Sequence, residues 1–474
     1  MNRLYYGDCL EIMNGMKLCS VDLIYLDPPF NSNRSYNAIY KDKTGRPLPE
    51  QVEAFCDIWV LNEERERAIT TMPVLMREAG IDDSAAALWK LWMNALRGTQ
   101  PKLLAYLSYM TERLLVMKGL LKPTGSIYFH CDPTASHYVK ALMDAIFGHE
   151  NFLNEIIWHY QTGGVSKRWF GKKHDVLLLY TKSKDYKFYP ERVMIPRTPE
   201  VIRRIKTGGE NATRAKNLHK YPDDVFEIQA LNAMAKERLG YPTQKPISLL
   251  RRITLASSDK DDVILDPFCG CATTIAAAHE LERGWIGVDI AYHAIRRVVQ
   301  ARLLDQYRLV EGENYTVDGI PKTEEAATDL WRRDKYQFQR WAVETVDGFI
   351  TTKKTNDGGI DGRIYISIPD SKNLASMIVE VKGGENVGIG VVRELRGAME
   401  RSGAEMAGLI VRAELGETKK RNFSKEMASA GDLDVMGKKY PKIQMLTVSE
   451  ILEGELFKTP SVSARGDGQT ALPL

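Results

Sequence analysis

The stretch Val21 to Phe30, VDLIYLDPPF, ends an apolar run with one carboxylate, two prolines and an aromatic ring. The apolar run is typical of a buried parallel strand. Because Pro28 and Pro29 cannot continue a hydrogen-bonded ladder, the chain must leave the sheet at Asp27. This places an acid, prolyl carbonyl groups and a ring at the carboxyl edge of a sheet, where open α/β folds bind ligands. A plain strand end with a turn looks the same, so other parts of the chain must decide.

A second apolar strand, in VILDPFCGCATTIAAA (Val263 to Ala278), also ends at an acid, Asp266. Gly270 permits close backbone approach in the turn that follows, and a helix expected from about Thr273 presents unpaired N–H groups. About 20 residues further on, WIGVDI ends another strand with Asp289, where an acid typically binds ribose hydroxyls. These features together indicate a nucleoside cofactor.

A third group of reactive residues lies in GGIDGRIYISIP and SMIVEVKGG. Asp361 begins one expected strand, while Glu380 and Lys382 are two residues apart on the next and share a face. Two carboxylates and an amine on adjacent strands can hold Mg²⁺, with Asp361 and Glu380 as ligands, and orient or deprotonate a water for phosphodiester hydrolysis. Glu and Lys also alternate on many exposed strands, but here Val379 and Val381 make a buried opposite face.

The elements that position these residues follow from periodicity. Strands are expected over 22–26, 126–130, 155–159, 176–180, 262–265 and 285–288, and helices over 103–121, 135–147 and 273–282. This β-α-β alternation predicts a doubly wound parallel sheet. Residues 31–101 form a long insertion, expected to be helical in its later part. Beyond a boundary, a helix over 336–346 and strands over 363–368 and 377–381 predict a second, smaller α/β unit.

Composition limits the class of protein. The chain has 474 residues, which suits two or three domains, and its 44% hydrophobic and 27% charged content is typical of a soluble globular protein. No apolar run approaches the roughly 18 residues of a membrane span, and no signal-peptide pattern is present, so we expect no membrane partner. None of the six cysteines forms a CxxC pair, which favours reduced thiols in a cytoplasmic protein over a zinc site.

The net charge of +3 does not by itself indicate a nucleic-acid partner, but its distribution is uneven. Residues 167–220 carry about fifteen Lys and Arg against about five acids, interleaved with aromatic residues. Such a tract suits contacts with phosphates and stacking on bases. A solvated loop explains the same composition equally well.

Several motifs in one order resemble those of the β class of DNA methyltransferases, which modify exocyclic amines. They are YYGDCLEIM from Tyr5, DPPF, YPTQKPISLLRRI (Tyr241 to Ile253), DPFCGCATT and WIGVDI. The resemblance covers residues 5–308 and implies a Rossmann-like fold that uses S-adenosylmethionine and acts on double-stranded DNA. An Asp at the head of the catalytic motif favours adenine N6, because families that modify cytosine N4 more often carry Ser there. Ala272 departs from the usual Gly-x-Gly-Thr-Thr, so the turn must accept a Cβ.

The resemblance implies a role for each site residue. Asp27 and the Pro28 carbonyl would accept hydrogen bonds from the target amino group and localise its lone pair for attack on the sulfonium methyl. Pro29 would help to fix the carbonyl directions, and Phe30 would stack on the flipped base. The cofactor pocket would be lined by Asp8 at the adenine, Asp289 at the ribose, Asp266, Phe268 and Gly270, with Lys245 as a further candidate.

The C-terminal unit resembles an Mrr-like restriction endonuclease domain of the PD-(D/E)xK superfamily over about 334–448, in FQRWAVE, GGIDGR, VEVK and VVRELRGA. The leading Pro of the superfamily name is Ile360 here, and Glu344 on the preceding helix is an auxiliary acid by the same resemblance. The expected organisation is a methyltransferase domain over 1–310, with target recognition at about 160–240, a linker over 311–325, an endonuclease domain over 326–458 and a disordered tail over 459–474.

The sequence therefore predicts one polypeptide that joins an adenine-N6 DNA methyltransferase to a Mg²⁺-dependent DNA endonuclease, as in restriction-modification. Two alternatives stay open: a methyltransferase whose C-terminal unit only binds DNA, and a regulatory DNA-binding protein without either activity. The intact Asp27-Pro28-Pro29-Phe30 argues against the regulatory protein, and the intact Asp361, Glu380 and Lys382 argue against the non-cleaving unit. The DNA sequence recognised and the oligomeric state, including a homodimer, do not follow from these motifs.

Overall fold

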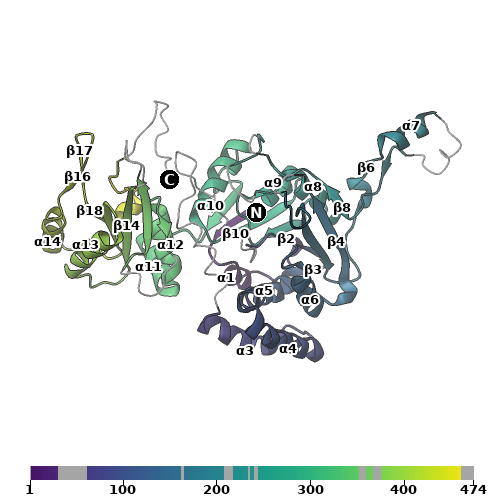
Figure 1. Ribbon diagram of the computed structural model, residues 1–474, viewed down its shortest axis with the longest axis horizontal. Helices are drawn as coiled ribbons and strands as arrows, with labels where there is room; N and C mark the ends of the chain where they lie inside the picture. The colour runs from purple at the N-terminus through teal and green to yellow at the C-terminus, as the bar shows by residue number, and fades with distance from the viewer. Residues whose placement is uncertain are drawn as a thin grey trace. The chain divides into compact units, whose positions relative to one another are not determined.

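The computed structural model describes residues 2–29, 61–161, 165–207, 217–232, 235–239, 244–351, 359–366 and 375–460. The chain forms two compact units, of which the first ends at Asp318 and the second begins at Gly319. Figure 1 shows the elements of each unit. Phe30 and residues 461–474 of the tail expected over 459–474 lie outside the described residues. No helix in the described part of the chain is long and apolar enough to span a membrane.

The first unit is built on a nine-stranded sheet with the order β11-β1-β10-β9-β2-β3-β5-β4-β8. Its strands are β1 (Asn2–Tyr6), β2 (Val21–Leu26), β3 (Leu121–Cys131), β4 (Phe152–His159), β5 (His174–Thr181), β8 (Val225–Glu227), β9 (Val263–Asp266), β10 (Gly284–Asp289) and β11 (Tyr315–Asp318). Residues 315–318, expected in the linker, thus form a strand of this sheet that pairs with β1.

The β-α-β alternation predicts a parallel sheet, but the sheet observed is mixed. Neighbouring strands are parallel except at β5, which runs antiparallel to both β3 and β4. The chain between β4 and β5 has no helix in its described residues. Without a crossover helix, the chain turns back beside β4 and must run in the opposite direction.

Helices cover both faces of this sheet. They are α1 (Cys9–Asn14), α5 (Pro101–Leu120), α6 (Ser136–Phe147), α8 (Ile247–Ser257), α9 (Thr273–Glu280) and α10 (Tyr292–Arg297), which continues into a π-helical segment, Val298–Gln306. Figure 1 shows α1, α5 and α6 on one side of the sheet and α8, α9 and α10 on the other. All six residues of β2 are buried, which explains its apolar run without alternation.

The expected insertion is helical in its described part. It forms α3 (Glu63–Glu78) and α4 (Asp83–Thr99). Met72 of α3 and Trp89 and Met93 of α4 belong to the same core cluster as Leu107 of α5 and Ile24 of β2. These two helices therefore extend the core that supports the central strand.

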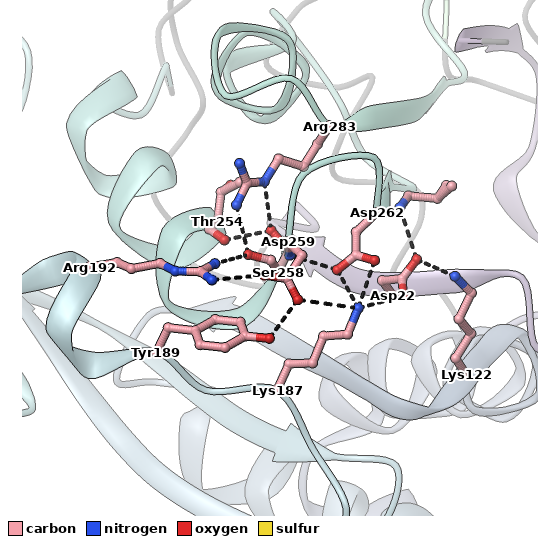
Figure 2. A network of polar contacts seen from close by, with 11 residues as sticks. Asp22, Lys122, Lys187, Tyr189, Arg192, Thr254, Ser258, Asp259, Asp262 and Arg283 are labelled. Carbon is pink, nitrogen blue, oxygen red and sulfur yellow. Dashed lines mark hydrogen bonds and ion pairs between the residues drawn. The ribbon is translucent and has the colours of Figure 1, made fainter.

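A network of hydrogen bonds and ion pairs between charged side chains joins the amino ends of β2 and β9 (Figure 2). Asp22, only 2% exposed, accepts hydrogen bonds from Lys122 Nζ at 2.6 Å and from the Val263 N–H at 3.0 Å. Lys187 Nζ lies 3.4 Å from Asp22 and binds both carboxylate oxygens of Asp262, at 2.7 and 2.6 Å. Burial acts to raise the pKa of Asp22, but its hydrogen bonds outweigh this effect and leave the pKa lowered.

The network continues onto the chain that follows β5. Tyr189 Oη and Arg192 Nη2 bind the carboxylate of Asp259, at 2.5 and 2.9 Å. Beyond this anchor come a 3₁₀ turn (Pro190–Val193), β6 (Ile195–Pro196), α7 (Pro199–Thr207) and β7 (His219–Lys220). Figure 1 shows α7 projecting from the first unit on an arm that includes β6.

The second unit contains a five-stranded sheet with the order β12-β13-β14-β15-β18. Its strands are β12 (Phe349–Ile350), β13 (Gly362–Ile366), β14 (Ala375–Lys382), β15 (Met406–Val411) and β18 (Ile443–Thr447), with a separate hairpin of β16 (Asp432–Val435) and β17 (Lys438–Pro441). Its helices are α11 (Glu324–Arg333), α12 (Lys335–Thr345), α13 (Gly390–Ser402), α14 (Glu417–Ala428) and α15 (Val448–Leu452). The expected small α/β unit is confirmed.

Candidate active site

Three acids lie together at the carboxyl edge of the nine-stranded sheet. Strand β9 pairs in parallel with both β10 and β2, so Asp266, Asp289 and Asp27 end or follow three adjacent strands. Asp266 is 3% exposed, and burial raises its pKa to about 7. The hydrogen bond from Thr274 opposes this rise, whereas the negative charges of Asp27 and Asp289 add to it. The three carboxylates therefore act on one another electrostatically.

The turn after β9 forms a cradle of backbone N–H groups. Gly270 N donates to Asp289 Oδ2 and Ala291 N donates to Asp289 Oδ1, both at 2.8 Å, so two N–H groups orient this carboxylate. Asp266 accepts from the Phe268 N–H at 3.1 Å, while the Phe268 ring packs on the edge of the core. A buried acid, an oriented acid and a helix N-terminus together fit an adenosyl cofactor.

Ala272 adopts a backbone conformation that favours glycine. Its φ and ψ are 58° and 41°, the left-handed region, at the N-cap of α9. Such an angle costs roughly 1–2 kcal/mol for a residue with a Cβ. Arg302 of the π-helical segment donates from Nε to the Cys271 carbonyl at 2.7 Å, and this contact holds the turn next to the strained residue.

Asp8 caps α1, because its carboxylate accepts from the Leu10 N–H at 2.7 Å. Arg113 of α5 donates to both oxygens of the same carboxylate, at 2.7 and 2.6 Å. Arg113 was not expected as a site residue, because it lies in a largely apolar helix beside Glu112 and no motif marks it. Its position shows that α5 orients the expected cofactor residue.

Lys245 contacts the expected catalytic acid. Its Nζ lies 2.5 Å from Asp27 Oδ2, and the two side chains are 12% and 17% exposed. Pro28 is buried and Pro29 is half-buried beside them. Lys245 was expected in the cofactor pocket, and in the structure its ammonium binds the Asp27 carboxylate.

Four further polar residues, which were not expected, form a hydrogen-bonded group on β2, β3 and β5 and on the residue that follows β4. Tyr25 Oη lies 2.8 Å from His130 Nδ1, His130 Nε2 lies 3.4 Å from Asp175 Oδ2, and Tyr160 Oη donates to Asp175 Oδ1 at 3.2 Å. The sequence does carry a signal for two of them: His130 ends the apolar run in IYFH, and Asp175 precedes the apolar run in HDVLLLY.

The residues expected to form the nuclease site, Asp361, Glu380 and Lys382, lie close together in the second unit. Gly362 pairs with Val379 across antiparallel strands, so Asp361 lies opposite Glu380. Asp361 accepts from the Val381 N–H at 2.7 Å, and Lys382 Nζ lies 2.6 Å from Glu380 Oε1. Two carboxylates and an amine therefore occupy one end of β14.

The charges of this group are already partly balanced. Burial acts to lower the pKa of Lys382, but the hydrogen bond and charge of Glu380 and the charge of Asp361 leave it raised. The expected auxiliary acid Glu344 is buried and forms an ion pair with Arg340 at 3.4 Å. Within the described residues, no three His, Cys, Asp or Glu side chains lie close enough to hold a metal ion.

Comparisons with known proteins find one matching family for each of the two units. Residues 21–300 match the N6_N4_Mtase family model, described as DNA methylase, and residues 335–453 match a model described as NACHT-associated inactive Restriction Endonuclease 1. Type II methyltransferase M2.MboI of Moraxella bovis is 44% identical over 290 residues, which cover 60% of this chain and 82% of that protein.

Two more distant similarities cover most of the first unit. DNA adenine methyltransferase YhdJ of Escherichia coli is 23% identical over 327 residues, 69% of this chain and 88% of the relative. Among solved structures, the PvuII DNA methyltransferase (cytosine-N4-specific) is 15% identical, with a TM-score of 0.39 over 70% of this chain and 92% of that one. The second unit is a restriction-endonuclease-like domain, and the chain belongs to the N6/N4 DNA methylase family through its residues 21–300.

Proposed function

We propose that the first unit transfers a methyl group to adenine N6 in double-stranded DNA, with Asp27 as the group that accepts a hydrogen bond from the target amine. The observation that carries this proposal is the position of Asp27 at the carboxyl edge, directly after β2, whose neighbour β9 ends in Asp266. The Asp of the catalytic motif supports adenine over cytosine, as does the name of YhdJ, a DNA adenine methyltransferase.

The chemistry depends on making the amino nitrogen a better nucleophile. Its lone pair is delocalised into the base, and hydrogen bonds to Asp27 and to the Pro28 carbonyl localise it. S-adenosylmethionine supplies the methyl group on a sulfonium centre. The nitrogen lone pair forms the new N–C bond, the C–S bonding pair stays on sulfur, and an amino proton leaves to water.

The cofactor residues keep the roles expected from the sequence in this proposal. Asp289, oriented by two N–H groups, would receive the ribose hydroxyls. Asp8, held by Arg113, would contact the adenine, while Asp266, Phe268 and Gly270 would line the pocket between them.

The test measures methyl transfer from labelled S-adenosylmethionine to unmethylated DNA, followed by nucleoside analysis of the product. Asp27→Asn should abolish transfer and keep cofactor binding, while the exposed Asp185→Asn serves as the matched control and should behave as wild type. Methylcytosine as the sole product would contradict the adenine assignment. Full activity in Asp27→Asn would contradict the catalytic role.

We propose that the arm that carries α7 binds the target DNA. Arg203, Arg204 and Lys206 have exposed side chains along this short helix, which suits phosphate contact. Replacing all three with Ala should weaken DNA binding and reduce its salt dependence, because fewer counterions are released. An unchanged salt slope would mean that the arm does not contact phosphates.

For the second unit, we propose Mg²⁺-dependent DNA cleavage in a restriction-modification protein. Asp361 and Glu380 would be the metal ligands, and Lys382 would orient the attacking water. The alternative is a DNA-binding domain without cleavage. It is favoured by the ion pair that already neutralises Glu380 and by the word "inactive" in the description of the matching family.

Plasmid cleavage separates these two functions. Wild type, Glu380→Gln and Asp27→Asn are incubated with Mg²⁺ and with methylated or unmethylated plasmid. Cleavage by wild type and Asp27→Asn but not by Glu380→Gln supports the nuclease. Intact plasmid in every reaction, together with DNA binding by the wild type, supports the non-cleaving domain.

A further inference from the structure

Strands β4 and β5 extend beyond the edge of the sheet at which Asp27 lies. The pairing of β2 with β3 ends one residue before Asp27, which puts Asp27 at the level of His130. His130 pairs with Leu177 of β5, and Leu177 pairs with Ile156 of β4. The pairing of β4 with β5 then continues for three more residues. At about 3.3 Å per residue, these two strands reach roughly 10 Å beyond the backbone of Asp27.

The connection between β4 and β5 is held by hydrogen bonds at its base and along its length. The Tyr160 N–H donates to the Lys173 carbonyl at 2.9 Å, and Lys173 Nζ donates to the Gln161 carbonyl at 3.0 Å. Ser166 Oγ accepts from the backbone N–H groups two and three residues later, at 3.1 and 3.3 Å. Such side-chain contacts order a bend in the backbone. The segment that follows Ser166 is therefore presented at the end of the β4–β5 pair.

This segment, KRWFGKK over residues 167–173, exposes two aromatic rings among positive charges. The Phe170 side chain is 98% exposed and that of Trp169 is 63% exposed. The segment contains four cations and no acid. A single exposed apolar side chain needs no explanation, but two adjacent rings between cations fit a polyanion with stacking faces. Phosphates would contact the cations and bases would stack on the rings, so the charge favours DNA over an apolar protein surface.

The proposed methyl transfer requires a distortion of the DNA near this segment. To reach Asp27, the target adenine must rotate by about 180° about its backbone, which leaves a gap in the base stack. The gap lies across that backbone, at a distance comparable with the width of the major groove, about 12 Å. Strands β5 and β4 are the second and third from β2, and a spacing of about 4.8 Å puts them roughly 10–14 Å to the side of Asp27. The exposed rings thus lie at the distance at which the gap opens.

We propose that Phe170 enters the duplex at the target site and fills the gap that the flipped adenine leaves. The inference rests on the proposed function of the first unit. The ring stacks on the bases next to the gap and replaces the contacts that they lose, which slows the return of the adenine. The flanking cations contact phosphates on either side. Phe170 is therefore a positioning residue for the target base and takes no part in the chemistry at the amine.

The experiment first locates the target adenine by sequencing methylated plasmid with modified-base detection. A DNA duplex that contains this site is then prepared in two forms, with the target adenine paired to thymine or placed opposite an abasic position. The rate of a single turnover is measured at saturating S-adenosylmethionine for wild type, Phe170→Ala, Phe170→Trp and Leu18→Ala. Leu18 precedes β2, is 66% exposed and provides the matched control.

Phe170→Ala should slow transfer to the paired duplex by about tenfold or more, but transfer to the unpaired adenine by no more than about twofold, because an unpaired base flips at lower cost. Phe170→Trp should keep most of the wild-type rate on both duplexes, since it retains a stacking face. Leu18→Ala should behave as wild type. Cofactor affinity and the thermal midpoint should be unchanged in all three variants.

A wild-type rate of Phe170→Ala on the paired duplex overturns the proposal. An equal loss on both duplexes also overturns it, because the ring would then contact DNA without filling the gap. Failure of the proposed function is distinct and shows in the first step, as wild-type plasmid without methyladenine. That result would remove the basis of the inference as well.

Discussion

Arg113 binds both carboxylate oxygens of Asp8, from a site where its own side chain is only 2% exposed. Its guanidinium carbon lies 3.3 Å from the centroid of the Tyr109 ring, and its Nε lies 3.3 Å from the Cys9 sulfur. Both contacts to Asp8 come from Nη2, and a charge-assisted hydrogen bond from a buried guanidinium to a carboxylate is strong. It joins α5 to α1 across 105 residues of sequence.

We expect Arg113→Met to destabilise the first unit by about 3 kcal/mol, because it leaves the Asp8 carboxylate beside an apolar side chain. It should also weaken S-adenosylmethionine binding, because Asp8 loses its orientation. Unfolding in urea and calorimetric titration of the cofactor measure the two effects. Arg97→Met is the control, since Arg97 and Glu66 form an ion pair at the surface, and it should change stability by less than about 1 kcal/mol. Unchanged cofactor affinity in Arg113→Met would contradict the role of Asp8.

The pKa of Asp266, about 7 against an ordinary value of 3.8, makes the stability of the first unit depend on pH. The folded state binds the proton more tightly than the unfolded state, so this contribution is full below about pH 4 and is lost as the pH rises through 7. The shift corresponds to about 4 kcal/mol at most. Asp266→Asn carries no charge and should flatten the dependence of unfolding free energy on pH between 5 and 8.

The measurement follows the urea transition of the first unit, recognised by its shift with added S-adenosylmethionine. Asp185→Asn, at an exposed position, should keep the wild-type slope against pH. An equal slope in Asp266→Asn would show that another group causes the dependence.

The substitution of Ala272 by glycine tests whether the turn after β9 is strained. Ala272→Gly should be neutral or stabilising by up to about 1 kcal/mol, because relief of the left-handed angle is offset by the greater freedom of glycine in the unfolded chain. Ala278→Gly in the same helix should instead destabilise by about 1 kcal/mol or more. Thermal unfolding distinguishes the two variants. Equal destabilisation by both would mean that position 272 carries no strain.

The sequence predicts those parts of the site that end apolar runs. Asp27, Asp266 and Asp289 each follow such a run, and parallel strands bring their carboxyl ends to one edge, so their proximity follows from the fold class. The same reasoning predicts Glu380 and Lys382 on one face, because they are two residues apart on a strand.

The other residues of the site are brought together by contacts between segments that are far apart in the sequence. Arg113 and His130 lie in largely apolar elements, and their partners Asp8 and Tyr25 are each 105 residues away. No periodicity marks such a pair. The contact of Lys245 with Asp27 spans 218 residues, and only the folded chain shows which carboxylate the ammonium reaches.

Lys187 provides the last prediction, on the network at the amino edge of the sheet (Figure 2). Its ammonium lies between Asp262 and the buried Asp22, so Lys187→Met leaves two carboxylates facing each other with less compensation. Breaking a buried pair costs about 3–5 kcal/mol, and the partial exposure of Lys187 reduces this to about 2 kcal/mol. Lys260→Met removes an ion pair with Glu282 in which both side chains are more than half exposed and should cost less than about 0.5 kcal/mol. Urea unfolding of the first unit compares the two variants at pH 7. Equal losses would mean that Lys187 is screened by solvent and does not anchor the chain that leads to the α7 arm.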